Sequence, residues 1–201
     1  MRRLPPADFH GAGLDLTKVA AGPRYVRICH RRHPDPLGYG KTPSRFSDPR
    51  RRITAGRFGV LYLGISLKVC FIEAVLRDRR DGVVGAFPID EAELRDRQYA
   101  EIEAESGLSL VDLTGDGAVR MGMPSDVLRG SHQGLARHWS LAFYAHPAAP
   151  DGIMYPSRLN GETNLAIYDR AVSKLSVVIT CELMHAPGLA AVLNDLRVAL
   201  V

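Results

Sequence analysis

The sequence predicts a single α+β domain with a mixed, mainly antiparallel sheet and flanking helices. Its 201 residues are 46% hydrophobic, which is enough for one substantial core. Apolar runs of strand length occur along the chain, and stretches with helical periodicity separate some of them. These segments do not alternate as regular strand–helix–strand units, and their order therefore favours an antiparallel sheet.

The first half of the domain is expected to open with a short strand over residues 25–28. Residues 33–49 contain six Pro and Gly residues, which is typical of an extended loop. An apolar run over residues 60–63 predicts a buried strand. Ser66 then fits the N-cap of a helix reaching about Arg80, and the buried stripe of this helix is Ile65, Val69, Ile72 and Leu76.

The second half is expected to hold more strands and two further helices. The strands are predicted over residues 83–89, 109–113, 152–155, 165–168 and 175–181. One helix, capped by Ser131, runs to residue 145 and buries Leu135, Trp139 and Ala142. A closing helix over residues 187–200 buries Leu189, Val192, Leu193 and Leu196. Residues 1–23, rich in Pro, Gly and Ala, are expected to wrap loosely as an N-terminal extension, which leaves 24–201 as the domain.

Positive charge is concentrated near the start of the domain. Residues 24–57 contain ten Lys and Arg residues against Asp35 and Asp48, a net charge of +8 in a chain whose total is +4. Such a concentration indicates an anionic ligand or partner, such as a nucleotide pyrophosphate, nucleic acid or an acidic protein. A solvated basic loop is the alternative.

Other features narrow the class of protein. No apolar run approaches the roughly 20 residues that span a bilayer, and no apolar region follows the N-terminal arginines as in a secretory signal. A cytoplasmic location is therefore expected. Cys29, Cys70 and Cys181 are far apart and are expected to be small buried side chains rather than nucleophiles. His30 and His33 lie among arginines, so no metal site is predicted.

Five residues stand out as candidates for chemistry. Arg27 lies within the first strand, Arg45 in the polar loop, Tyr62 in the apolar strand, Glu73 in the helix after it and Ser157 after a later strand. Each also has an ordinary structural explanation. The arginines fit surface cations, Tyr62 a core residue and Ser157 a turn, while Glu73 fits an ion pair with Arg77 at i+4.

In combination, these segments resemble the RES domain, which is named for its Arg, Glu and Ser. The resemblance covers about residues 24–180 and follows the order Tyr-x-Arg-Ile, Arg-Phe-x-x-Pro, Val-Leu-Tyr-Leu-x-x-Ser, Glu and Asp-Gly-Ile-x-Tyr-x-Ser-Arg. The family's Arg-Phe-Asn is Arg45-Phe46-Ser47 here, a departure that puts one polar contact in question.

The resemblance implies a fold similar to the diphtheria-toxin-like ADP-ribosyltransferases. It also implies a bacterial, cytoplasmic toxin that takes NAD⁺ as substrate and is covered at its active site by a cognate antitoxin. The implied catalytic residues are Glu73, Ser157 and Arg27, and the implied NAD⁺-binding residues are Arg27, Arg45, Tyr62 and Ser157. No metal is expected.

These residue types suit cleavage of the nicotinamide–ribose bond. A carboxylate such as Glu73 opposes the positive charge that builds on the ribose in an oxocarbenium-like transition state. A guanidinium, from Arg27 or Arg45, binds a pyrophosphate through two parallel hydrogen bonds. The ring of Tyr62 suits the nicotinamide, and Ser157 either holds the ribose or positions Glu73.

The acceptor of the ADP-ribose is not visible in the sequence. We favour transfer to a protein acceptor, and the alternative is a glycohydrolase or phosphorylase that depletes NAD⁺ without a protein target. An alternative of another class is a nucleic-acid-binding protein or ribonuclease toxin, although the toxin alone is expected to bind neither nucleic acid nor membrane. The triplet Arg50-Arg51-Arg52 is expected to meet an acidic surface on the antitoxin or the modified protein.

Overall fold

A computed structural model describes residues 4–50 and 56–201 of the chain. In these residues, eight strands form one curled sheet in the order β1-β6-β7-β8-β3-β2-β5-β9, and β10 pairs with β4 beside it. The strands are β1 (Leu16–Val19), β2 (Arg24–His30), β3 (Val60–Gly64), β4 (Phe87–Ile89), β5 (Arg97–Ala104), β6 (Leu108–Asp112), β7 (Gly152–Pro156), β8 (Thr163–Tyr168), β9 (Leu175–Glu182) and β10 (Val198–Leu200).

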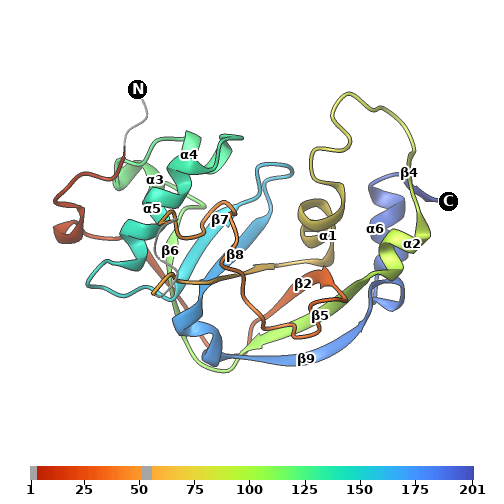
Figure 1. Ribbon diagram of the computed structural model, residues 1–201, viewed down its shortest axis with the longest axis horizontal. Coiled ribbons are helices and arrows are strands. Elements are labelled where there is room, and N and C mark those ends of the chain that lie inside the picture. The colour runs from red at the N-terminus through yellow and green to blue at the C-terminus, as the bar shows by residue number, and fades with distance from the viewer. Residues whose placement is uncertain (1–3, 51–55) are drawn as a thin grey trace.

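The helices are short and gather in two groups above the sheet (Figure 1). One group holds α3 (Gly117–Arg120), α4 (Asp126–Arg129) and α5 (Gly134–Tyr144), and the other holds α1 (Leu67–Phe71), α2 (Glu91–Arg95) and α6 (Leu189–Asp195). A π-helical turn, η2 (Ile72–Leu76), continues α1, and the 3₁₀ turns are η1 (Phe9–Gly11), η3 (Asp169–Lys174) and η4 (Leu183–His185). None of the helices in the described residues combines the length and the apolar character that crossing a membrane requires.

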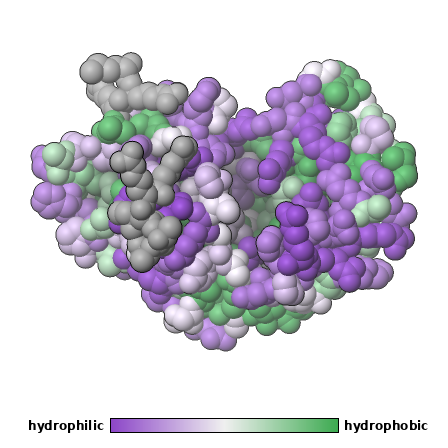
Figure 2. Space-filling model, in the orientation of Figure 1, coloured by the Kyte–Doolittle hydropathy of each residue, from purple (hydrophilic) through white to green (hydrophobic). Residues whose placement is uncertain are grey.

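Antiparallel pairing dominates the sheet and confirms the predicted fold class. Only β6 and β7 run parallel within it, while β3 pairs antiparallel with β8 over its whole length. Three clusters of buried side chains stabilise the curled shape. One packs beneath α5 around Trp139, one beneath α1 around Phe71, and the third lies inside the curl around Leu61 and Ile102. The surface between the two groups of helices is hollowed (Figure 2).

Several predicted boundaries need correction. Residues 16–19, expected to wrap loosely, form β1 and pair with β6. Only Phe87–Ile89 of the predicted strand 83–89 is extended, and the strand β5 was not predicted. The closing helix ends at Asp195 because Arg197 has a φ of 50°, which reverses the chain so that β10 can pair with β4.

The caps of the two long predicted helices differ in outcome. Ser66 is confirmed as an N-cap, because its side chain accepts a hydrogen bond from the N–H of Val69 at 3.1 Å. Ser131 does not cap α5, which begins at Gly134 after Gln133. The hydroxyl of Ser131 instead lies 3.3 Å from Nδ1 of His132.

Candidate active site

A cleft of about 580 Å³ lies at the hollow between the two groups of helices, and it contains most of the predicted site. Arg27, Arg45, Tyr62 and Glu73 line it, although the sequence separates the first and last of them by more than forty residues. Ser157 does not line this cleft. It is buried, lines a smaller pocket beside Pro156 and Arg158, and reaches Glu73 through a hydrogen bond.

Glu73 enters the cleft from a π-helical turn. The helix that Ser66 begins changes pitch at Ile72, and the N–H of Arg77 donates to the carbonyl of Ile72 at 2.7 Å, five residues back. Such single π turns recur at functional sites, because they redirect one side chain out of the regular helical face. The predicted helix to Arg80 therefore ends early, at Leu76, and Arg77 takes a positive φ of 48°.

A glycine brings this helix close to the central strand. Gly64 ends β3, and a Cβ atom there would lie 2.6 Å from both the Sγ atom of Cys70 and a methyl carbon of Val69. With any larger residue here, the side chains of α1 that face the strand would have to shift, since a Cβ atom does not pack this closely against its neighbours. Gly64 therefore helps to set the distance between Glu73 on the helix and the strands opposite it.

The carboxylate of Glu73 is held by two neutral donors. The hydroxyl of Ser157 donates to Oε1 of Glu73 at 2.7 Å, and Nδ2 of Asn164 approaches the same oxygen at 3.4 Å. The hydroxyl of Ser157 also accepts from the N–H of Leu159 at 3.1 Å, so its single O–H is committed to Glu73 while its oxygen is fixed by the backbone. Of the two roles foreseen for Ser157, this geometry favours positioning Glu73.

The expected surface ion pair between Glu73 and Arg77 does not form. Nε of Arg77 donates at 3.3 Å to the backbone carbonyl of Glu73, while the carboxylate points to Ser157. The i+4 spacing was therefore a poor guide here, because the π turn changes which side chains share a face.

Arg27 and Arg45 enter the cleft from different segments and are both half-buried. Nη1 of Arg27 donates to the carbonyl of Pro36, and Nη1 of Arg45 donates to the carbonyls of Val127 and Gly130 at 3.1 and 3.2 Å. Burial lowers the pKa of both guanidinium groups from the usual value. Each has its charge in a partly dehydrated setting, where an anion binds more strongly than at an open surface.

Tyr62 uses its hydroxyl within the protein and presents its ring to the cleft. The hydroxyl lies 2.9 Å from Oγ of Ser44 and accepts from the N–H of Phe46 at 2.9 Å. Burial raises the pKa of Tyr62, so the phenol stays protonated. This residue therefore belongs both to the cleft wall and to the support of the loop that carries Arg45.

Sequence reasoning missed several residues that line the same cleft, among them Asn164, Tyr155, Asp78 and Arg158. Arg158 and Asp78 form an ion pair between the turn after β7 and the loop after η2. Arg158 stands inside the motif Tyr-x-Ser-Arg, which was the available signal. Asn164 interrupts an apolar strand, and no motif in its own segment predicted that it would line the site.

The described residues that line the cleft leave it with net positive charge. Four arginines (Arg27, Arg45, Arg77 and Arg158) face two carboxylates (Glu73 and Asp78), a balance of +2. This balance suits a ligand with two negative charges, such as a dinucleotide pyrophosphate.

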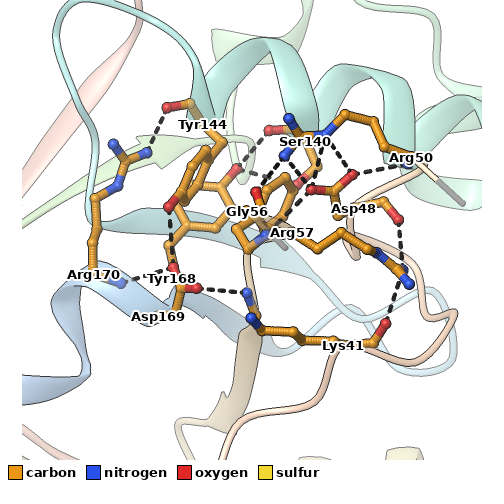
Figure 3. Close-up of polar contacts among 12 residues, drawn as sticks. Lys41, Asp48, Arg50, Gly56, Arg57, Ser140, Tyr144, Tyr168, Asp169 and Arg170 are labelled. Carbon is orange, nitrogen blue, oxygen red and sulfur yellow. Dashed lines mark hydrogen bonds and ion pairs between the residues drawn. The ribbon is translucent and has the colours of Figure 1, made fainter. Parts of the chain in front are cut away.

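Much of the predicted basic segment has a structural use instead. Arg24 and Arg31 form ion pairs with Glu103 and Glu182, and Nε of Arg50 donates to the buried Asp48 at 2.9 Å (Figure 3). These pairs weaken the argument for a nucleic-acid surface. Arg51 and Arg52, the rest of the expected partner-binding triplet, lie outside the described residues.

The cysteines match their expected role only in part. Cys70 is buried, its Sγ donates to the carbonyl of Val26 at 3.0 Å, and burial raises its pKa to about 12. A thiol with this pKa is no nucleophile at neutral pH. Cys29 and Cys181 are half-buried rather than buried.

Comparison with known proteins places this chain in a family. The model of the RES domain matches residues 24–186, which is most of the chain. The chain belongs to the RES family. The match spans the segments that supply Arg27, Arg45, Tyr62, Glu73 and Ser157 to the site.

Two relatives of this RES-domain protein are informative. A protein of Sinorhizobium fredii (strain NBRC 101917 / NGR234), described as probable toxin y4kH, is 41% identical over 127 residues, which are 63% of this chain and all of the relative. A chain in the crystal structure of the M. tuberculosis MbcT–MbcA toxin–antitoxin complex superposes with a TM-score of 0.63. It is 17% identical, and the match covers 90% of this chain and 91% of the other, which confirms the predicted ADP-ribosyltransferase-like fold.

Proposed function

We propose that this RES-domain protein is the toxin of a bacterial toxin–antitoxin pair and that its cleft cleaves NAD⁺. The observation that carries the proposal is Glu73, a carboxylate aimed into a positively charged cleft and held by Ser157 and Asn164. The resemblance to a probable toxin and to a chain from a toxin–antitoxin complex supports the biological setting.

In this proposal the substrate binds by its charges. The pyrophosphate of NAD⁺ takes the free N–H groups of Arg27 and Arg45, because guanidinium groups bind such oxyanions through paired hydrogen bonds. The nicotinamide packs against the ring of Tyr62. The two negative charges of the pyrophosphate match the +2 balance of the side chains that line the cleft.

Glu73 then acts on the bond that breaks. As nicotinamide leaves, positive charge develops on the ribose, and a fixed carboxylate beside it lowers the energy of that state. Ser157 and Asn164 are neutral, so they orient the carboxylate without cancelling its charge. An arginine bonded to Glu73 would have neutralised it.

We favour a protein side chain as the acceptor of the ADP-ribose, with release to water or phosphate as the alternative. We also propose that a cognate antitoxin covers the cleft and so denies NAD⁺ access to Glu73. Both points extend the activity beyond cleavage itself.

The first experiment incubates the purified full chain with NAD⁺ and follows nicotinamide release. Release by the wild-type protein supports the proposal, and its absence at high protein concentration would overturn it. Mass spectrometry of cell extract treated with protein and NAD⁺ then distinguishes between the possible acceptors of the ADP-ribose. Modified proteins favour transfer, while free ADP-ribose or its phosphate favours depletion of NAD⁺.

A further inference from the structure

The loop that carries Arg45 is fastened from both of its flanks by side chains of α5. Nε of Arg137 donates to the carbonyl of Ser44 at 2.9 Å, and the hydroxyl of Ser140 donates to the carbonyl of Phe46 at 2.7 Å. The contacts therefore hold the residues immediately before and after Arg45.

Packing makes these attachments rigid. Phe46 is fully buried, and its ring meets that of Tyr155 edge-on at a centroid distance of 4.8 Å. Ser140 is also fully buried, and its hydroxyl lies 3.1 Å from that of Tyr168 (Figure 3). The anchor after Arg45 therefore belongs to the core of the domain.

The anchor before Arg45 is different, because Arg137 supplies it from a half-buried position. Apart from Arg137, the carbonyl of Ser44 accepts among the described residues from Ser47 alone, through its hydroxyl at 3.1 Å and its N–H at 3.4 Å. Both bonds lie within the loop and do not join it to another element. Arg137 thus connects the Ser44 backbone to the helix.

Arg45 depends on this support for its direction. Its Nη1 is committed to the carbonyls of Val127 and Gly130, so Nε and Nη2 are the groups left to meet a ligand. A planar fork binds a pyrophosphate well only when its plane and position are fixed. Small rotations of the Ser44–Arg45 backbone would turn the fork away from the ligand.

We propose that Arg137 is a positioning residue for substrate binding, which orients Arg45 toward the pyrophosphate through the backbone of Ser44. This inference rests on the proposed function, because it assumes NAD⁺ as the ligand of the cleft. Arg137 itself does not line the cleft, whereas its neighbour Gln133 does. Its effect must therefore pass through the loop.

The test compares Arg137→Met with Arg120→Met, which removes an exposed guanidinium bonded to Asp15 in the same half of the molecule. Calorimetric titration with NAD⁺ is expected to give about tenfold weaker binding for Arg137→Met and no change for the control. In turnover, KM for NAD⁺ should rise by the same factor while kcat stays within about twofold, since the pyrophosphate is remote from the bond that breaks.

Two further variants separate positioning from general loss of structure. Arg137→Lys keeps a donor long enough for the Ser44 carbonyl and should recover most of the affinity. In an Arg45→Lys background, where the fork is already lost, adding Arg137→Met should weaken binding little further. Should Arg137→Met fail to fold, Arg137→Gln, which is polar but shorter, carries the same expectation.

The outcomes distinguish this inference from the function on which it rests. If the wild-type chain binds no NAD⁺, the proposed function is wrong. If the wild type binds and Arg137→Met binds equally well, or if its effect adds fully to that of Arg45→Lys, the positioning role of Arg137 is wrong while the proposed function stands.

Discussion

Among the described residues, Glu73 forms no ion pair, although the side chains that line its cleft carry a net positive charge. Its bonded side-chain partners among the described residues are the hydroxyl of Ser157 and the amide of Asn164, both neutral. The charge is therefore available to a cation that forms only during a reaction. A structural carboxylate at this position would more commonly pair with one of the neighbouring arginines.

We expect Glu73→Gln to abolish NAD⁺ cleavage and toxicity while leaving the fold intact. The amide keeps an oxygen that can accept from Ser157, so the loss is one of charge, which costs roughly 3–4 kcal/mol of transition-state stabilisation. Nicotinamide release measures the effect, and thermal unfolding checks the fold. Glu91→Gln on α2, where a partly exposed carboxylate pairs with Arg95 away from the cleft, is the control. Undiminished release by Glu73→Gln would remove Glu73 from the mechanism.

At the scale of elements, the start of α1 is fastened to the turn that carries Ser157. The hydroxyl of Ser66 accepts from the N–H of Val69 and donates to Oε2 of Glu162 at 2.7 Å. The carbonyl of Glu162 in turn accepts from the N–H of Ser157 at 2.7 Å. The side chain of Ser66 thus caps α1, which leads to Glu73, and joins this helix to the segment that carries Ser157.

Ser66→Ala is expected to lower the free energy of unfolding by about 2 kcal/mol, because it removes a cap and a hydrogen bond to a carboxylate. Denaturant unfolding measures the loss. Ser125→Ala is a matched control, since Ser125 precedes α4 without a side-chain cap bond and should change stability by less than about 0.5 kcal/mol. Equal effects of the two substitutions would argue against the junction.

The base of the Arg45 loop depends on Asp48. Burial alone would raise the pKa of this carboxyl, but hydrogen bonds from the guanidinium of Arg50 and from the N–H groups of Arg50 and Phe58 outweigh it and hold the pKa below its usual value. A carboxyl whose pKa is lower in the folded state stabilises the fold above its unfolded pKa. That contribution is lost as the pH falls through the folded pKa.

Asp48→Asn should therefore cost roughly 2 kcal/mol of stability at pH 7, and the difference from wild type should shrink below about pH 4. Urea unfolding at several pH values measures both the stability difference at pH 7 and its decrease at low pH. Asp116→Asn, at a side chain that is 88% exposed, serves as the control. A difference that stays constant down to pH 3 would mean that the charge of Asp48 does not stabilise the loop.

The sequence predicted most strands whose apolar runs are uninterrupted, such as β3 and the 165–168 part of β8, because burial on both faces leaves a clear signature. It did not reveal β5, where Ala100, Glu101 and Glu103 favour helix and only pairing between β2 and β9 makes the segment extended. For the site, Glu73 and Ser157 were predicted from motif order. Asn164 and Arg137 were not, because their roles arise from contacts across 91 and 93 residues.

At the scale of the whole molecule, the arginines fall into two groups, those that line the cleft and those outside it. The cleft holds its own arginines, while Arg24, Arg31 and Arg50 are engaged in ion pairs outside it. Arg51 and Arg52 lie beyond the described residues, yet their charge follows from the sequence. We expect them to speed association with an acidic antitoxin surface, as long-range attraction does for oppositely charged partners.

Replacing Arg51 and Arg52 by alanine should slow association with the antitoxin by several-fold at low salt, and the deficit should shrink as salt screens the charges. Arg50 is kept, because it bonds Asp48. Stopped-flow mixing measures the rates, and Arg95→Ala/Arg120→Ala removes the same charge elsewhere. Nicotinamide release without antitoxin should be unchanged. Wild-type association combined with lost release would instead place the pair at the active site.

The position of β3 between β8 and β2 has a consequence for the time at which the cleft is completed during synthesis. The ribosome makes Arg27, Tyr62 and Glu73 early, but the strand that completes one side of β3 and supplies Asn164 comes after residue 162. A nascent chain therefore exposes the arginines and the carboxylate long before they share a cleft. An unfinished copy therefore lacks the complete cleft, and only a chain that has left the ribosome nearly whole can offer it to a ligand or partner.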